Sequence, residues 1–229
     1  MKATHLLYYN NSDYPNKLRE CADAPSMLYA IGNVDFNNNY VLSIVGTRKS
    51  DANAQRYIDN FIADLRQYRK DIVIVSGLAF GVDTIAHETA IKYGFKTVAV
   101  MGTGFDHIYP TENTDLAKRI IDTHGALLTE YEYGHPILPD NFPQRNRIVA
   151  GLCDALLVVQ SPIRGGSLIT ATLANSYNRD VFAFPGRPDD ELFAGCNHLI
   201  RNNCAAPSGH KRPPASGRRR APIPSGATR

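Results

Sequence analysis

The sequence predicts an α/β fold in which a doubly wound, mostly parallel sheet carries helices on both faces. Strand-like and helix-like patterns alternate along the chain, which is typical of βαβ units. Several predicted strands are short apolar runs without alternation, as expected of strands that are buried on both faces. Right-handed crossover connections then place helices on both sides of the sheet.

The regular pattern begins at Val41 and predicts six strands, most of them ended by small or polar residues. These strands are 41–45, 72–75, 97–101, 126–129, 155–159 and 181–184. Helical spacing of apolar residues between the strands predicts four helices. The predicted helices cover residues 54–68, about 85–93, 115–122 and 167–177.

The two ends of the chain differ from this regular part. Residues 1–40 are polar and irregular and predict an N-terminal extension rather than a domain, although Leu18 and Met27-Leu28-Tyr29 can pack against a neighbouring domain. The regular domain is predicted over residues 41–204. Residues 205–229 are rich in Pro, Ser, Gly, Ala and Arg, so we expect disorder there. Whether this tail is a basic arm for nucleic acid, or a non-native segment from cloning or a shifted reading frame, stays open.

Composition narrows the function classes. The formal net charge is +3, but the tail holds six basic and no acidic residues, which leaves 19 basic against 22 acidic residues in 1–204. Binding to nucleic acid therefore needs a local basic patch rather than a global field. Four scattered cysteines without a Cys-x-x-Cys pair predict neither a metal cluster nor a disulfide framework. The absence of a long apolar run and of a secretory pattern predicts a cytoplasmic protein without a membrane partner.

Small and polar residues follow the predicted strands. They are Gly46-Thr47-Arg48, Ser76-Gly77, Gly102-Thr103-Gly104, Thr129-Glu130, Gln160-Ser161 and Pro185-Gly186. The carboxyl ends of parallel strands meet at one edge of a sheet, where ligands bind in such folds. Turns alone also need glycine, but several such turns in register favour a binding edge.

The turn at Ser76-Gly77 is the most informative of these. A buried strand ends there and helical spacing begins a few residues later, so the amides that open the helix are predicted to face an anion such as a phosphate. We expect Asp83 to cap or order this turn, and His87 to be a packed, hydrogen-bonded histidine rather than a catalytic one.

Two further motifs suggest phosphate binding. Phe142-Pro143-Gln144-Arg145-Asn146-Arg147 pairs two guanidinium groups with an amide and a ring that can face a base. The alternative is a plain helix start with solvated arginines, and both can hold together. Arg164-Gly165-Gly166-Ser167 precedes an apolar helix, so its amides can hold an anion, with Ser167 as the cap; a simple N-cap is the alternative.

Several common sites are not predicted. The chain has no Gly-x-x-x-x-Gly-Lys-Ser/Thr loop, no complete Gly-x-Gly-x-x-Gly fingerprint after the first strand and no Gly-x-Ser-x-Gly elbow. We assign no nucleophile, no metal site and no cofactor, and expect a protein that is not an enzyme.

Taken together, these motifs resemble the DNA-processing protein A family (DprA/Smf). The order and spacing agree over about residues 27–203, in stretches that include Ser76-Gly77-Leu78-Ala79-Phe80-Gly81-Val82-Asp83, Phe142-Pro143-Gln144-Arg145-Asn146-Arg147-Ile148, Gly166-Ser167-Leu168-Ile169-Thr170-Ala171 and Gly195-Cys196-Asn197-His198-Leu199-Ile200. The resemblance implies an extended Rossmann-like domain that binds single-stranded DNA, protects incoming DNA and helps load the RecA recombinase in natural transformation, as a homodimer without catalytic turnover.

The resemblance, together with the motifs, assigns a set of DNA-binding residues. They are Gly46, Thr47, Arg48, Ser76, Gly77, Phe142, Arg145, Asn146, Arg147, Arg164, Gly166 and Ser167. The chain departs from the family at Gln160-Ser161, at Gly165 and in the tail, which stands where the family often has a small winged-helix-like domain. The alternative is a nucleotide-processing enzyme similar to nucleoside monophosphate phosphoribohydrolases; against it, the Pro-Gly-Gly-x-Gly-Thr pattern of those enzymes is missing and Gly165-Gly166-Ser167 matches it only partly.

Overall fold

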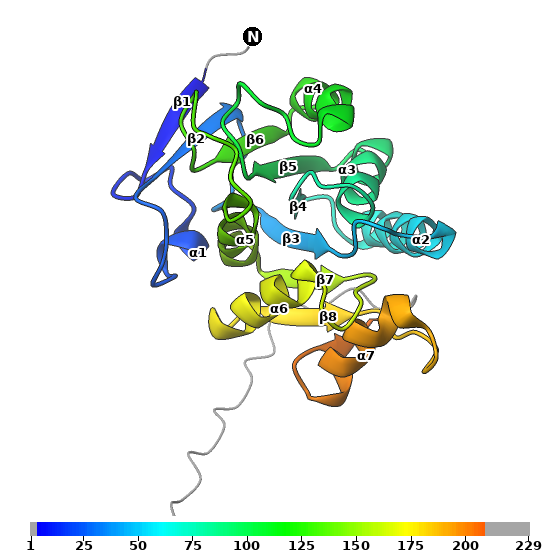
Figure 1. The fold of residues 1–229 in the computed structure, drawn as a ribbon. Coiled ribbons are helices and arrows are strands. Elements are labelled where there is room, and N and C mark those ends of the chain that lie inside the picture. The colour runs from blue at the N-terminus through cyan, green and yellow to red at the C-terminus, as the bar shows by residue number, and fades with distance from the viewer. Residues whose placement is uncertain (1–3, 209–229) are drawn as a thin grey trace, which may run out of the picture.

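A computed structural model describes residues 4–208, and it places helices on both faces of one nine-stranded sheet (Figure 1). The elements in chain order are β1 (Thr4–Tyr8), α1 (Asn16–Arg19), β2 (Met27–Gly32), β3 (Tyr40–Val45), α2 (Ala52–Tyr68), β4 (Ile72–Ser76), α3 (Val82–Lys92), β5 (Lys96–Met101), η1 (Thr111–Asn113), α4 (Thr114–Asp122), β6 (Ala126–Thr129), α5 (Asn141–Leu152), β7 (Ala155–Val158), α6 (Gly166–Ser176), β8 (Asp180–Ala183), η2 (Glu191–Phe193), α7 (Ala194–Arg201) and β9 (Ala206–Pro207).

The sheet is mostly parallel, as predicted. Its strand order is β1-β2-β6-β5-β4-β3-β7-β8-β9, and only the β1–β2 and β2–β6 pairs are antiparallel. The central strands are fully buried runs such as Ile72–Ser76, which explains why their sequences lack alternation. The predicted α/β class is therefore confirmed.

Helices cover the two faces in separate groups. α2, α3 and α4 pack against one another or the sheet on one face, while α1, α5 and α6 form the other layer (Figure 1). α2 shows why its sequence becomes a helix, because buried residues recur at helical spacing from Ala54 through Ile58 and Ile62. Its first turn is capped by Asp51, whose carboxylate accepts hydrogen bonds from the amides of Asn53 and Ala54.

The winding direction of the sheet reverses at β3. β4, β5 and β6 extend from one side of β3, and β7 and β8 from the other. The loops that leave β3 and β7 therefore diverge above their carboxyl ends and leave a crevice, which is the usual ligand position in open α/β sheets. We call this place the switch point.

The first forty residues are more than the predicted extension. β1 and β2 join the same sheet, and Tyr29 lies opposite Thr129 on β6. Tyr14, Leu18 and Leu28 are fully or almost fully buried in the main core. A boundary at residue 40 is thus not a boundary of the folded unit.

The C-terminal part also extends beyond the predicted strands. α7 was not predicted, and β9 pairs with β8 while the amide of Ser208 donates to the carbonyl of Ala183 at 2.8 Å. The start of the predicted tail, at residues 205–208, is therefore ordered. The rest of that tail lies outside the described residues. No helix between residues 4 and 208 is long and apolar enough to cross a membrane.

Candidate nucleic-acid interface

A pocket of about 390 Å³ opens at the switch point. It is bounded by the segments that follow β3, β4 and β7 and by one side of α5. We call it the switch-point pocket, and its lining residues are Val45, Gly46, Thr47, Arg48, Gly77, Ala79, Asp83, Arg145, Asn146, Val149, Pro162, Gly165, Gly166, Ser167 and Thr170. Eight of the twelve residues predicted to bind DNA are in this lining, so the structure brings most of that set together.

The N-terminus of α6 faces this pocket with free amides. Gly165 is the N-cap residue and provides no side-chain cap. Within residues 4–208, the amides of Gly166 and Ser167 have no hydrogen-bond acceptor, whereas that of Leu168 donates to the carbonyl of Gly165 at 3.0 Å. Such amides, together with the helix dipole, favour an anion at this end of the helix.

Ser167 does not have the role that its position suggested. It lies inside the first turn of α6 rather than at the cap, and its hydroxyl donates to Ser161 Oγ at 2.8 Å. The predicted Ser167 cap is therefore wrong. The serine instead ties the start of the helix to the segment that leaves β7.

Arg145 reaches the pocket from α5 and is 4% exposed. Its Nη1 donates to the carbonyls of Gly77 and Val100, and its Nε donates to Asn146 Oδ1 at 3.3 Å. Its Nη2 has no hydrogen-bond partner in the described part of the chain. Burial lowers the pKa of Arg145, while the nearby carboxyl of Asp83 acts in the opposite direction. One nearly buried guanidinium thus brings a free nitrogen to the pocket that the α6 amides also line.

Part of the turn between β4 and α3, predicted to hold an anion, is used by the protein itself. The amides of Gly77 and Ala79 donate to Asp83 Oδ2 at 3.1 and 3.3 Å. Asp83 therefore orders the turn, as expected, and takes two of its amide donors. Among residues 4–208 the amides of Phe80, Gly81 and Asp83 have no acceptor, so the external anion on this turn stays a prediction.

Two further groups near that turn are also used internally. The amide of Val82, which opens α3, donates to the carbonyl of Thr47 at 3.2 Å. Ser76 donates its hydroxyl to the carbonyl of Ile44 at 2.6 Å, and Ser76 does not line the pocket. Gly77 does line it, and a Cβ there would lie 2.7 Å from both Arg145 Nη2 and Asp83 Oδ2. Glycine is needed here to admit two side chains rather than a ligand.

The segment after β3 forms the third wall. The amide of Thr47 donates to the carbonyl of Gln160 at 2.7 Å, which joins the ends of β3 and β7. A Cβ at Gly46 would lie 2.5 Å from Val82 Cγ2, so glycine allows α3 to pack closely here. Arg48 is exposed at the rim, and its Cζ lies 5.8 Å from the ring centroid of Phe142.

Two predicted arginines lie outside this pocket lining. Arg147 pairs with Glu130, and its Nη1 is buried without a partner among residues 4–208. Residues two apart on a helix point to different sides, so Arg145 and Arg147 cannot serve one phosphate. Arg164 is exposed on the loop before α6. Both remain predictions as DNA contacts.

Rings that were not predicted lie next to Phe142. Phe80 and Tyr109 line a small hollow with Phe142, and the Tyr109 and Phe142 ring centroids are 5.1 Å apart. The peptide bond between Tyr109 and Pro110 is cis. The sequence contained these residues within recognisable stretches, but nothing in their spacing showed that the rings meet.

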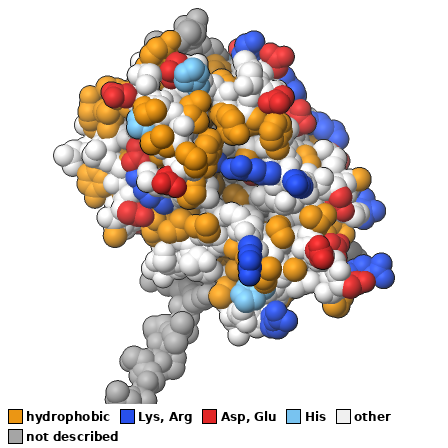
Figure 2. All heavy atoms as spheres, in the orientation of Figure 1, with side chains coloured by type: hydrophobic (Ala, Val, Ile, Leu, Met, Phe, Trp, Pro, Cys, Tyr) orange, Lys and Arg blue, Asp and Glu red, His pale blue; other side chains and the backbone are white. Residues whose placement is uncertain are grey.

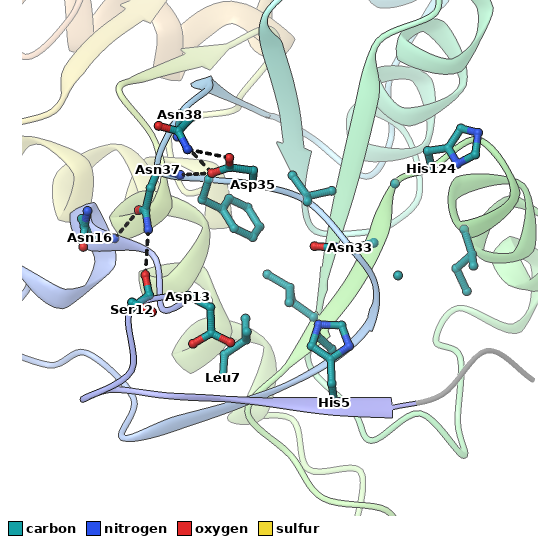
Figure 3. Close-up of a pocket in the computed structure, with 18 residues that line it drawn as sticks. His5, Leu7, Ser12, Asp13, Asn16, Asn33, Asp35, Asn37, Asn38 and His124 are labelled. Atoms are coloured by element: carbon teal, nitrogen blue, oxygen red, sulfur yellow. Dashed lines mark hydrogen bonds between the residues drawn. The ribbon is translucent and has the colours of Figure 1, made fainter.

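A larger hollow of about 950 Å³ lies at the other end of the sheet, over β1, β2 and β6 (Figure 3). Asp13 and Asp35 are among its lining residues, which include no lysine or arginine. The carboxylate of Asp35 accepts bonds from Asn37 and Asn38, while Asn37 is also bonded to Ser12 and Asn16 (Figure 3). The negative charge of the two aspartates disfavours a phosphate in this larger hollow, so the size of a hollow alone does not identify the anion site.

Neither a metal cluster nor His87 offers chemistry at this edge within the described residues. No group of three or more His, Cys, Asp or Glu side chains within residues 4–208 is placed to bind a metal ion. His87 is fully buried and bonded to Thr97 Oγ1 at 2.7 Å, and burial lowers its pKa to about 3. It is the packed histidine that the sequence predicts.

Comparisons with known proteins point to one family. The model of the family described as DNA recombination-mediator protein A matches residues 5–212. The chain is 43% identical to DNA processing protein DprA of Streptococcus pneumoniae over 188 residues, which are 82% of this chain and 65% of that protein. It is 40% identical to Protein Smf of Synechocystis over 205 residues, which are 88% of this chain and 51% of that protein. The chain therefore spans about half to two thirds of the length of these relatives.

Solved structures agree with this family. The X-ray structure of DprA from S. pneumoniae has a TM-score of 0.81 at 39% identity, covering 88% of this chain and 70% of that one. DprA from Helicobacter pylori, whose structure is described as giving insight into its single-stranded DNA binding mode, has a TM-score of 0.79 at 29% identity, covering 90% and 91%. These matches support the expected Rossmann-like fold.

Proposed function

Because the chain belongs to the DNA recombination-mediator protein A family, we propose that it binds single-stranded DNA at the switch-point pocket without chemical turnover. The observation that carries this proposal is the convergence of free donors at one place. The amides of Gly166 and Ser167, the Nη2 of Arg145 and the rim guanidinium of Arg48 all belong to the same pocket.

These donors suit a phosphodiester. Amides at a helix start stabilise a negative charge, and arginine nitrogens form charge-assisted bonds with phosphate oxygens. Contacts of this kind do not read base identity, so we expect little sequence preference. They release counterions from the DNA, so affinity should fall steeply as salt is raised.

In the cell, we propose that the protein protects incoming DNA and helps load the RecA recombinase during natural transformation. The family description as a recombination mediator supports this partner. We further propose that the protein is a cytoplasmic homodimer. Sedimentation velocity tests the dimer, and the rate at which RecA assembles on single strands coated by a single-strand binding protein tests the loading activity.

The binding proposal is tested by removing one amide hydrogen. Gly166→Pro deletes the donor at the first position of α6, where proline is tolerated, and the extended backbone of Gly165 (φ −74°, ψ 144°) is compatible with a following proline. Gly166→Ala keeps the donor, and its Cβ would have no heavy atom within 4 Å. We expect Gly166→Pro to weaken binding of a labelled oligonucleotide about 10-fold, and Gly166→Ala to change it less than about 2-fold.

Arg48→Ala should also weaken binding about 10-fold at low salt, because it removes a rim charge. All proteins should carry glutamine in place of the six basic tail residues, so that the tail does not supply the affinity. Equal affinity for single strands and duplex, or no binding by the tail-neutralised chain, contradicts the proposal. Release of free base from a nucleoside monophosphate would favour the nucleotide-processing alternative.

A further inference from the structure

Three aromatic side chains form a partly exposed surface beside the switch-point pocket. Phe80 is 44% exposed and Tyr109 is 47% exposed, and Phe142 lies tilted against Tyr109 at an angle of 49°. We call these three rings the aromatic ledge. Large apolar side chains with this exposure, gathered in one place, often mark a binding surface.

The ledge is continuous with the pocket. Its own small hollow shares four residues with the switch-point pocket, namely Arg48, Gly77, Ala79 and Arg145. On the face shown in Figure 2, hydrophobic and basic side chains adjoin each other near the centre. A ligand with one anionic and one aromatic part can therefore contact both surfaces at once.

Phe142, one ring of the ledge, is held in place by contacts within the protein. A Cβ at Gly102 would lie 2.9 Å from Phe142 Cδ1, so the ring packs directly on the glycine backbone. Arg48 lies over the same ring at cation–π distance. The Tyr109 ring in turn packs on Phe142, with the two ring centroids 5.1 Å apart.

We propose that the aromatic ledge accepts an unstacked base whose neighbouring phosphate occupies the switch-point pocket, and that Phe80 and Tyr109 are further DNA-contacting residues. This inference rests on the proposed function. Every base has a face that stacks on a ring, so the contact tolerates any sequence. In a duplex the base faces are covered by neighbouring bases, so the ledge gives the protein its selectivity for single strands.

The test separates rings from phosphates by using two ligands of equal length. One is a labelled oligothymidylate, and the other is an oligonucleotide of abasic sites, which keeps the phosphates and lacks the bases. Phe80→Ala and Tyr109→Ala should each weaken oligothymidylate binding by about 5- to 20-fold and leave the weaker binding of the abasic strand unchanged. Tyr109→Phe should retain wild-type affinity within about 2-fold.

Tyr68→Ala is the matched control. Tyr68 is 65% exposed and ends α2, at the edge of the sheet opposite the switch point, so its loss should affect neither ligand. Circular dichroism of each variant checks that the fold is intact.

The outcomes distinguish the ledge from the pocket. If Phe80→Ala and Tyr109→Ala bind oligothymidylate like the wild type while Arg48→Ala does not, the ledge proposal is overturned and the DNA-binding proposal stands. If the ring variants lose both ligands equally, the rings only shape the pocket, and the ledge proposal is again overturned. If Arg48→Ala and Gly166→Pro also bind both ligands unchanged, the proposed function itself fails.

Discussion

The β4–α3 turn and the β7–α6 turn lie at the same edge of the sheet and both contain glycine before a helix. They differ in what uses their amide hydrogens. In the β4–α3 turn, Asp83 and the carbonyl of Thr47 accept these bonds. In the β7–α6 turn, the amides of Gly166 and Ser167 have no acceptor within residues 4–208. A side chain of the protein can therefore take some of the amide donors that a glycine-rich turn offers to an anion, as Asp83 does in the β4–α3 turn.

The largest expected effect on the free energy of unfolding comes from removing Asp83, the side-chain acceptor in the β4–α3 turn. Asp83→Ala leaves the buried amide of Gly77 and the part-buried amide of Ala79 without a partner and removes a carboxyl that interacts with Arg145, so the free energy of unfolding should fall by about 3 kcal/mol. Asp83→Asn keeps an oxygen that can accept and should lose less. Urea denaturation measures both. An Asp83→Ala protein as stable as the wild type would contradict the conclusion that Asp83 orders the β4–α3 turn.

A smaller effect is expected from adding one methyl group to each turn. Gly77→Ala places its Cβ within 2.7 Å of Arg145 and Asp83, so stability should fall by about 2 kcal/mol. Gly166→Ala meets no heavy atom within 4 Å and should change stability by less than about 0.5 kcal/mol. Thermal and urea unfolding of the pair give the comparison. Equal losses at the two positions would show that the turns are equally crowded.

For each unit of pH, a change of pH should alter the free energy of unfolding least of all. This effect arises at His87 in α3. Thr97 donates its hydroxyl to the carbonyl of Ile74, so His87 Nδ1 carries the hydrogen and Nε2 is a buried acceptor without a partner among residues 4–208. Burial, followed by the charge of Arg145, lowers the pKa of His87 to about 3 from 6.5. The unfolded chain therefore binds this proton first as pH falls.

The stabilising contribution of neutral His87 is complete above pH 6.5 and is lost as pH falls towards 3. Between pH 7 and pH 5 the wild type should lose about 2 kcal/mol more than His87→Asn, which cannot titrate there. Burial raises the pKa of Asp83, so Asp83 favours stability at low pH, but both proteins share that term. Parallel pH profiles for the two proteins would contradict the assignment to His87.

The sequence was sufficient for the parallel part of the fold. Buried runs such as Ile72–Ser76 are apolar on both faces, and their helices show clear spacing, so the local pattern carries the information. β1 and β2 were missed because their partners are not local. β2 pairs with β6, about a hundred residues further along the chain, and no sequence pattern near Met27 predicts that pairing.

The site was predictable in its location and less so in its details. The small and polar residues after the strands predicted which edge of the sheet binds the ligand. Arg48, Arg145 and Gly166 were assigned to that edge, and they line the pocket there. The sequence could not show that Asp83 fills one turn, since that depends on side-chain direction. Helical spacing could have separated Arg145 from Arg147, because Val149 rather than Arg147 shares the pocket side of α5 with Arg145.

The antiparallel edge also constrains the order of folding. β1 and β2 are synthesised early, but β2 can pair with β6 only after β6 has been synthesised. Likewise, β3 can pair with β7 only once β7 has been synthesised. Pairings this distant close large loops and are slow to form. During part of its synthesis the chain therefore has a strand, β2, whose partner β6 does not yet exist, and aggregation or chaperone binding would compete with folding at this stage.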